Sequence, residues 1–131
     1  MRRFTETGKW TDNNWFRALP PDYKLIWLYI LDRCDAAGVW SSDPELAEFC
    51  LGIKAINWVE VLKYFEGRVH VLPNQKWWII GFIDYQFKGI RLKEDYNPHK
   101  GAVSSLRHYG LWDEKNKYPL YPNSENSSLF D

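Results

Sequence analysis

The stretch that decides the fold covers residues 57–80 and reads NWVEVLKYFEGRVHVLPNQKWWII. Its first part repeats apolar side chains at the i, i+3, i+4, i+7 spacing of one helical face, namely Trp58, Val61, Leu62 and Phe65. Two runs of β-branched and aromatic residues follow, 69–72 and 77–80, and four residues separate them. The stretch therefore predicts a short helix that ends near Gly67, followed by a β-hairpin with a four-residue loop.

A longer helix is predicted upstream, opened by Pro20-Pro21-Asp22 and followed by Gly38. Proline is tolerated in a first helical turn, and an acidic residue there interacts favourably with the helix dipole. Apolar residues cover more than one face of this helix, which predicts a central position. Val39-Trp40 then predicts one short strand. A capping box from Ser42 to Glu45 predicts a second short helix over residues 43–51.

The order helix, short strand, helix, helix, hairpin predicts an α+β fold, the winged helix-turn-helix, with the third helix as recognition helix and the hairpin as wing. Asn97-Pro98 predicts the start of an additional C-terminal helix that Gly110 ends. We expect one winged-helix domain over residues 1–111, with an aromatic N-terminal segment that inserts into it. Asn, Ser, Lys and Pro dominate from Asp113 on, so residues 112–131 are expected to form a disordered tail.

The composition excludes several classes of protein. Of the 131 residues, 45% are hydrophobic and 18% aromatic, which argues against an intrinsically disordered chain. No apolar run approaches the roughly 18 residues that a membrane span needs, and no apolar run follows the charged start as in a secretory signal. We therefore expect a cytoplasmic protein without a membrane partner. Cys34 and Cys50 lie in predicted helices and are expected to be buried free thiols.

Catalysis is not predicted. The cysteines and histidines lack the spacing of metal ligands, and the sequence contains no glycine-rich phosphate loop, HExxH motif or nucleophile elbow. Asp32 and Asp35 lie three residues apart, which a solvated helix face explains without chemistry. We therefore expect no catalytic residue, no metal site and no cofactor.

Duplex DNA is the partner expected for a winged helix, although 17 basic and 17 acidic residues cancel over the whole chain. The polar side of the third helix would enter the major groove, and cations of the wing would meet phosphates. Glu60 would repel phosphate, so an ordinary solvated helix face remains the alternative. The candidate DNA-binding residues are Lys54, Asn57, Lys63, Arg68, Lys76, Lys88 and Arg91.

The aromatic residues allow two further interpretations. Trp77 or Trp78 would offer a stacking platform to single-stranded DNA, because neighbouring strand residues point to opposite faces and one of the pair would leave the core. The alternative is that other segments cover both indoles. An uncovered patch at Trp78, Tyr85 or Phe87 would instead be a surface for self-association or for a protein partner.

Several local patterns occur in a fixed order along the chain. They are Lys9-Trp10, Asn14-Trp15-Phe16-Arg17-x-Leu19, Lys24-Leu25-x-Trp27-Leu28-Tyr29, Gly38-Val39-Trp40, Trp58-x-Glu60-x-Leu62, Lys76-Trp77-x-Ile79, Phe82-Ile83-x-x-Gln86-Phe87 and Asn97-Pro98-His99-Lys100. In these patterns the chain resembles phage replisome-organiser and replication-initiation proteins, whose N-terminal domain is similar to the winged-helix domain of DnaD-type primosomal proteins. The resemblance covers about residues 3–111.

The resemblance implies a role at the replication origin of a phage or other mobile element. Proteins of this kind bind DNA, self-associate and recruit helicase-loading proteins. The expected function is therefore a DNA-binding winged helix in replication initiation, with homo-oligomers and helicase-loading proteins as further expected partners. A protein-interaction or oligomerisation module of a primosome, with little or no DNA binding of its own, is the alternative.

Overall fold

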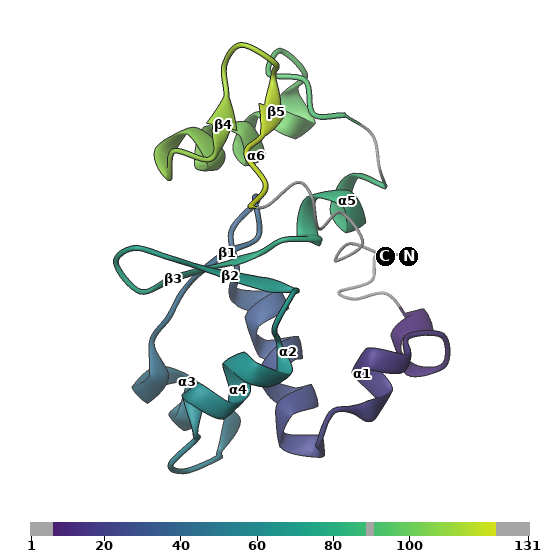
Figure 1. Ribbon diagram of the computed structural model, residues 1–131, viewed down its shortest axis with the longest axis vertical. Helices are drawn as coiled ribbons and strands as arrows, with labels where there is room; N and C mark the ends of the chain where they lie inside the picture. Colours follow the sequence, from purple (N-terminus) through teal and green to yellow (C-terminus); the bar gives the residue numbers. More distant parts are fainter. Residues whose placement is uncertain (1–6, 89–90, 123–131) are drawn as a thin grey trace. The chain divides into compact units, whose positions relative to one another are not determined.

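The computed structural model describes residues 7–88 and 91–122, and these divide into two compact units. Of the described residues, 7–33 and 42–65 form a helical unit, and 34–41, 66–88 and 91–122 form a sheet unit. The fold is mixed α+β with a small antiparallel sheet (Figure 1). The sequence predicts a single domain over residues 1–111, whereas the chain crosses between these two units three times.

The helical unit contains one 3₁₀ helix and four α-helices. They are η1 (Thr7–Trp10), α1 (Asn14–Ala18), α2 (Pro21–Arg33), α3 (Pro44–Leu51) and α4 (Trp58–Tyr64). The longest of them, α2, begins at the predicted Pro-Pro-Asp sequence and carries three of the buried residues of the unit, Ile26, Trp27 and Ile30. The three predicted helices between Pro20 and Gly67 are therefore confirmed.

An aromatic cluster packs α1, α2 and the end of α4 together. Trp15, Trp27 and Phe65 meet in edge-to-face geometry, with ring centroids 4.9 Å (Trp15–Trp27), 5.0 Å (Trp27–Phe65) and 5.8 Å (Trp15–Phe65) apart. The Trp15 indole Nε1 also donates a hydrogen bond to the Tyr64 carbonyl at 2.9 Å. The predicted insertion of the N-terminal aromatics is confirmed for Phe16, which is fully buried, whereas Trp10 is half-exposed.

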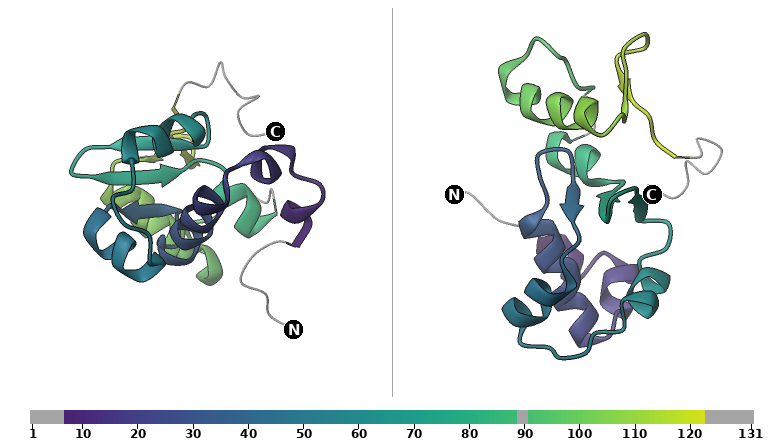
Figure 2. Two further views of the ribbon diagram at one scale, coloured as in Figure 1. Left: turned by 90° about the horizontal axis from the view of Figure 1, so that it is seen from below. Right: turned by 90° about the vertical axis from the view of Figure 1, so that its left-hand side faces the viewer.

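The sheet unit places three strands in the order β1-β3-β2, all antiparallel (Figures 1 and 2). The register pairs Val39 with Trp78 on one side of β3 and His70 with Trp78 on the other. Two helices and a small second hairpin complete the unit. The elements are β1 (Val39–Ser41), β2 (Val69–Leu72), β3 (Lys76–Ile79), α5 (Phe82–Phe87), α6 (Asn97–His108), β4 (Trp112–Asp113) and β5 (Tyr118–Pro119).

Asp35 organises the turn that leads into β1. Its Oδ1 accepts hydrogen bonds from the backbone N–H groups of Ala37 and Val39, at 2.9 and 3.0 Å, and its Oδ2 accepts one from the Ser105 hydroxyl at 2.5 Å. Gly38 has a φ of +90°, and a Cβ there would lie 2.5 Å from the Cβ of Phe82, so only glycine fits this turn. The carboxylate thereby fixes α6 to the start of the sheet.

Three sequence-based expectations need correction at the level of local structure. Asp43 caps α3 in place of Ser42, because its carboxylate accepts the Leu46 N–H at 3.1 Å. The loop of the hairpin has three residues, because Lys76 pairs with Leu72 and so belongs to β3. Neither thiol is in a disulfide, but Cys50 is exposed and Cys34 is only partly buried, so the expected burial of both is wrong.

The expectation of a disordered segment from residue 112 is wrong for residues 112–122; residues 123–131 lie outside the described part of the chain. β4 pairs with β5, the Leu120 N–H donates to the Leu111 carbonyl at 2.7 Å, and Trp112 is buried. Tyr121 stacks flat on Trp78, with ring centroids 5.2 Å apart and an interplanar angle of 2°. The polar composition of this segment predicts disorder, but its few aromatic residues, Trp112 and Tyr121, pack into the sheet unit and order it.

We expect Tyr121→Ala to lower the free energy of unfolding by about 2 kcal/mol, because it removes the ring that covers Trp78 and leaves a cavity. Leu120→Ala is the matched control: Leu120 is 48% exposed, so its truncation should change stability by less than about 0.5 kcal/mol. Urea unfolding followed by tryptophan fluorescence measures both values. Equal effects of the two substitutions would contradict a structural role of the stack.

Candidate nucleic-acid interface

The turn between α3 and α4 carries Lys54 and is held by a side chain of α3. Glu48 Oε1 accepts the Ala55 N–H at 3.0 Å, and its Oε2 accepts the Trp58 indole N–H at 3.4 Å. Ala55 has a φ of +55°, a left-handed conformation that costs an alanine about 1 kcal/mol or more. The Glu48 carboxylate therefore stabilises a turn geometry that the local sequence does not favour.

Asn57 has a structural role at the start of α4. Its Oδ1 accepts the Glu60 N–H at 3.2 Å, the N-cap of the helix. Asn57 is one of the residues predicted to bind DNA. With its Oδ1 engaged in the cap, its amide N–H₂ group remains to donate to a base edge. Lys54 and Lys63 are exposed, at the turn and near the end of α4. Three of the residues predicted to bind DNA, Lys54, Asn57 and Lys63, thus lie on α4 or in the turn before it.

Glu60 is engaged within the helical unit. Burial, followed by a hydrogen bond to Glu60, raises the pKa of the Tyr23 hydroxyl above its ordinary value. The tyrosine hydroxyl is a neutral donor, so this hydrogen bond positions the Glu60 carboxylate against α2 without removing the repulsion of phosphate that the sequence predicts.

The two predicted wing cations lie at opposite ends of the hairpin. Arg68 directly precedes β2 at the open end, and Lys76 begins β3 beside the loop. Burial lowers the pKa of the half-buried Arg68 guanidinium. Lys76 Nζ donates to the Ser41 hydroxyl of β1 at 2.5 Å. These cations are therefore separated along the hairpin, and Lys76 already contributes to the sheet.

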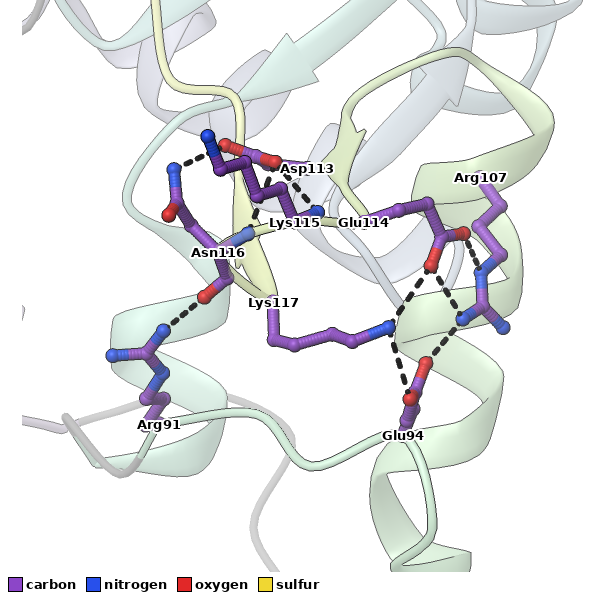
Figure 3. A network of polar contacts seen from close by, with 8 residues as sticks. All are labelled: Arg91, Glu94, Arg107, Asp113, Glu114, Lys115, Asn116 and Lys117. Carbon is purple, nitrogen blue, oxygen red and sulfur yellow. Dashed lines mark hydrogen bonds and ion pairs between the residues drawn. The ribbon is translucent and has the colours of Figure 1, made fainter.

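Lys88 and Arg91 follow α5 and have different environments. Lys88 is exposed, and its backbone caps α5 in a left-handed conformation. Arg91 donates to the Asn116 carbonyl, and its guanidinium lies 5.5 Å from the ring centroid of Tyr118, so it binds the β4–β5 hairpin (Figure 3). Arg91 thus has a structural contact within the sheet unit, and its predicted contact with DNA stays a prediction.

A network of exposed ion pairs joins the β4–β5 hairpin to α6 and to the loop before α6 (Figure 3). Arg107 on α6 pairs with Glu94 and with Glu114, the latter at 2.5 Å. Lys117 pairs with the same two carboxylates, at 3.1 and 3.3 Å. These hydrogen bonds hold the pKa of both carboxyls below the ordinary glutamate value: the largest cause is Lys117 for Glu94 and Arg107 for Glu114.

The predicted stacking platform is absent from the described surface. Trp78 is fully buried, and its Nε1 donates to the Ala37 carbonyl at 3.1 Å. Trp77 is 5% exposed and meets Trp40 edge to face at 5.1 Å. The alternative of covered indoles is therefore correct for both. Of the three aromatic residues predicted as a stacking or partner surface, Tyr85 is the exposed one, at 45%.

Two apolar side chains are exposed that the sequence patterns do not predict to be exposed. Phe49 on α3 is 83% exposed, and Val59 on α4 is 68% exposed. The available signal is the composition of α3, in which apolar residues occupy five of eight positions, too many for one buried face of a short helix. Periodicity identifies a buried stripe but does not identify which apolar residue lies outside it.

The comparisons with known proteins add no relative: no family model, no curated protein and no solved structure matches the chain. Within the described ranges, none of the helices is both long and apolar enough to cross a bilayer. The same ranges contain no group of three His, Cys, Asp or Glu side chains that could hold a metal ion.

We expect Glu48→Ala to lower the free energy of unfolding by about 1–3 kcal/mol, because two donors of the α3–α4 turn lose their acceptor. Glu45→Ala removes the same charge from an exposed position of the same helix and should change stability by about 0.5 kcal/mol or less. Urea unfolding measures both, and hydrogen exchange at the Ala55 amide reports the turn directly. Unchanged protection of that amide in Glu48→Ala would show that the carboxylate does not hold the turn.

The ion-pair network predicts a pH dependence. Glu94 and Glu114 have folded pKa values below their unfolded values, so they stabilise the fold at neutral pH, and this contribution is lost as the pH falls below about 4.3. In the double variant Glu94→Gln/Glu114→Gln, the free energy of unfolding should therefore decrease less between pH 6 and pH 3 than in the wild type. Urea unfolding across this range tests it, and parallel curves for the two proteins would refute it.

Proposed function

We propose that the chain is a winged helix-turn-helix protein that binds DNA without catalysis. The observation that carries this proposal is the combination of the chain order α2-β1-α3-α4-β2-β3 with the strand order β1-β3-β2. In a winged helix-turn-helix the first strand pairs with the hairpin and the third helix reads the major groove. In this assignment α4 is the recognition helix and the β2–β3 hairpin is the wing.

The exposed side chains of α4 support a DNA contact. Lys54 in the preceding turn and Lys63 near the helix end offer two cations to phosphates, and the Asn57 amide N–H₂ group lies at the helix start, where recognition helices reach base edges. The exposed Val59 is suited to the methyl group of a thymine. In the sheet unit, Arg68 and Lys88 are further cations predicted to contact phosphates.

The biological role that we propose is replication initiation of a phage or other mobile element, which rests on the resemblance to replisome-organiser proteins. The second candidate is an assembly module of a primosome with little DNA binding of its own. The contacts of Lys76 and Arg91 within the sheet unit support this second candidate, because two of the predicted DNA cations also have a structural role. Salt dependence separates the two, because phosphate contacts weaken steeply with salt and apolar association does not.

The test is fluorescence anisotropy of labelled duplex and single-stranded DNA titrated with the full chain at low and at physiological salt. We expect salt-sensitive binding with a preference for duplex. Lys54→Glu and Lys63→Glu should each weaken it about tenfold and reduce the salt slope by about one unit.

Lys115→Glu is the matched control, because it makes the same charge change at an exposed position of the β4–β5 hairpin. It should leave the affinity within about threefold of wild type. Equal losses in all three variants would assign the effect to net charge and overturn the placement at α4. Absence of binding even at low salt would overturn the DNA proposal and support the assembly module.

A further inference from the structure

The exposed face of α3 has no evident place in DNA binding. Phe49 is 83% exposed and Leu46 is 37% exposed, and residues three apart on a helix lie on the same face. A single exposed apolar side chain is common on protein surfaces, but Phe49 and Leu46 together form an exposed apolar patch, and such patches mark interaction sites. We call the surface formed by Asp43, Glu45, Leu46 and Phe49 the α3 face.

The charge on the α3 face is negative. Glu45 lies four residues before Phe49 and therefore beside it on the helix, and both Glu45 and the cap residue Asp43 are exposed. No Lys or Arg occurs between Pro44 and Leu51. Apolar side chains that insert into DNA act together with cations that bind phosphates. An apolar side chain flanked by carboxylates is instead suited to a protein partner that carries positive charge.

A second copy of the same face does not fit as the occupant. In a two-fold symmetric contact the same patch of both chains meets, so the contact would bring together Asp43 and Glu45 of both copies, four carboxylates with no Lys or Arg of α3 between them. Like charges at an interface disfavour association. We propose that the α3 face docks an amphipathic helix of a partner protein, in which Lys or Arg residues flank an apolar stripe. This inference goes beyond the proposed DNA binding and does not depend on it.

The test uses the ¹⁵N-labelled full chain and two synthetic peptides. One peptide is an amphipathic helix with leucines at the i, i+3, i+4, i+7 spacing and lysines elsewhere, and the other has glutamates in place of the lysines. We expect the lysine peptide to shift the amide resonances of residues 43–51 and to bind at least tenfold more tightly than the glutamate peptide. Equal binding of the two peptides, or shifts that map elsewhere, would overturn the proposal.

Variants locate the effect on the α3 face. Phe49→Ser and Glu45→Lys should each weaken binding of the lysine peptide at least tenfold, and both positions are exposed, so the fold should be unaffected. Leu25→Ser is the matched control, because Leu25 is a 48% exposed apolar residue of α2, and it should leave binding unchanged. Equal effects of Phe49→Ser and Leu25→Ser would show that the peptide binds apolar surface in general.

Two further measurements distinguish the other occupants. Sedimentation velocity of wild type and Phe49→Ser tests self-association, and a wild-type dimer that Phe49→Ser abolishes would make a second copy the occupant. DNA anisotropy with Phe49→Ser should match wild type, whereas a loss of DNA affinity would assign the α3 face to DNA. Either result would overturn the partner-helix proposal, and neither depends on whether Lys54 and Lys63 bind DNA.

Discussion

The aromatic cluster of Trp15, Trp27 and Phe65 is the contact on which the candidate site depends. The candidate recognition helix α4 has only seven residues, and an isolated helix of that length is not stable in water. Its stability must come from packing. Phe65 directly follows α4 and is fully buried in the cluster, and the Trp15 indole binds the Tyr64 carbonyl at the helix end. Trp15, which is distant from α4 in the sequence, thus helps to fix α4, the helix that carries Lys63.

Short-range patterns predict much of this fold because they arise from local physics. Helix spacing over residues 58–65 and β-branched runs in the hairpin locate α4, β2 and β3 to within a residue or two. Competition between neighbouring caps is harder to predict. Ser42 and Asp43 both carry an N-cap oxygen, and the pattern Ser-x-x-Glu favours the first, but the carboxylate of Asp43 accepts the N–H of Leu46. Which of two adjacent residues caps the helix depends on backbone angles that the sequence does not show.

The remaining differences come from partners far away in the sequence. Alternation along β3 predicts that Trp77 and Trp78 point to opposite sides, but not that both sides are covered. Trp78 is covered by Tyr121, 43 residues later, in a segment whose polar composition predicts disorder. The same limit applies to charges. Arg91 and Lys76 look like free cations in the sequence, whereas their contacts with Asn116 and Ser41 exist only in the folded chain.

The contacts of the glutamates change how the charge on α3 and α4 is interpreted. Residues 43–64 contain four acidic residues and two lysines, a balance that would disfavour DNA if every charge acted alike. Glu48 accepts two N–H donors of the α3–α4 turn, and Glu60 accepts a hydrogen bond from Tyr23, so both carboxylates have structural contacts within the helical unit. Asp43 and Glu45 lie at the start of α3, where the helix dipole stabilises negative charge. Three of the four acidic residues therefore belong to α3 and its cap, and both exposed lysines belong to α4 and the turn before it. This separation is the physical basis for proposing partners of opposite charge for two neighbouring short helices.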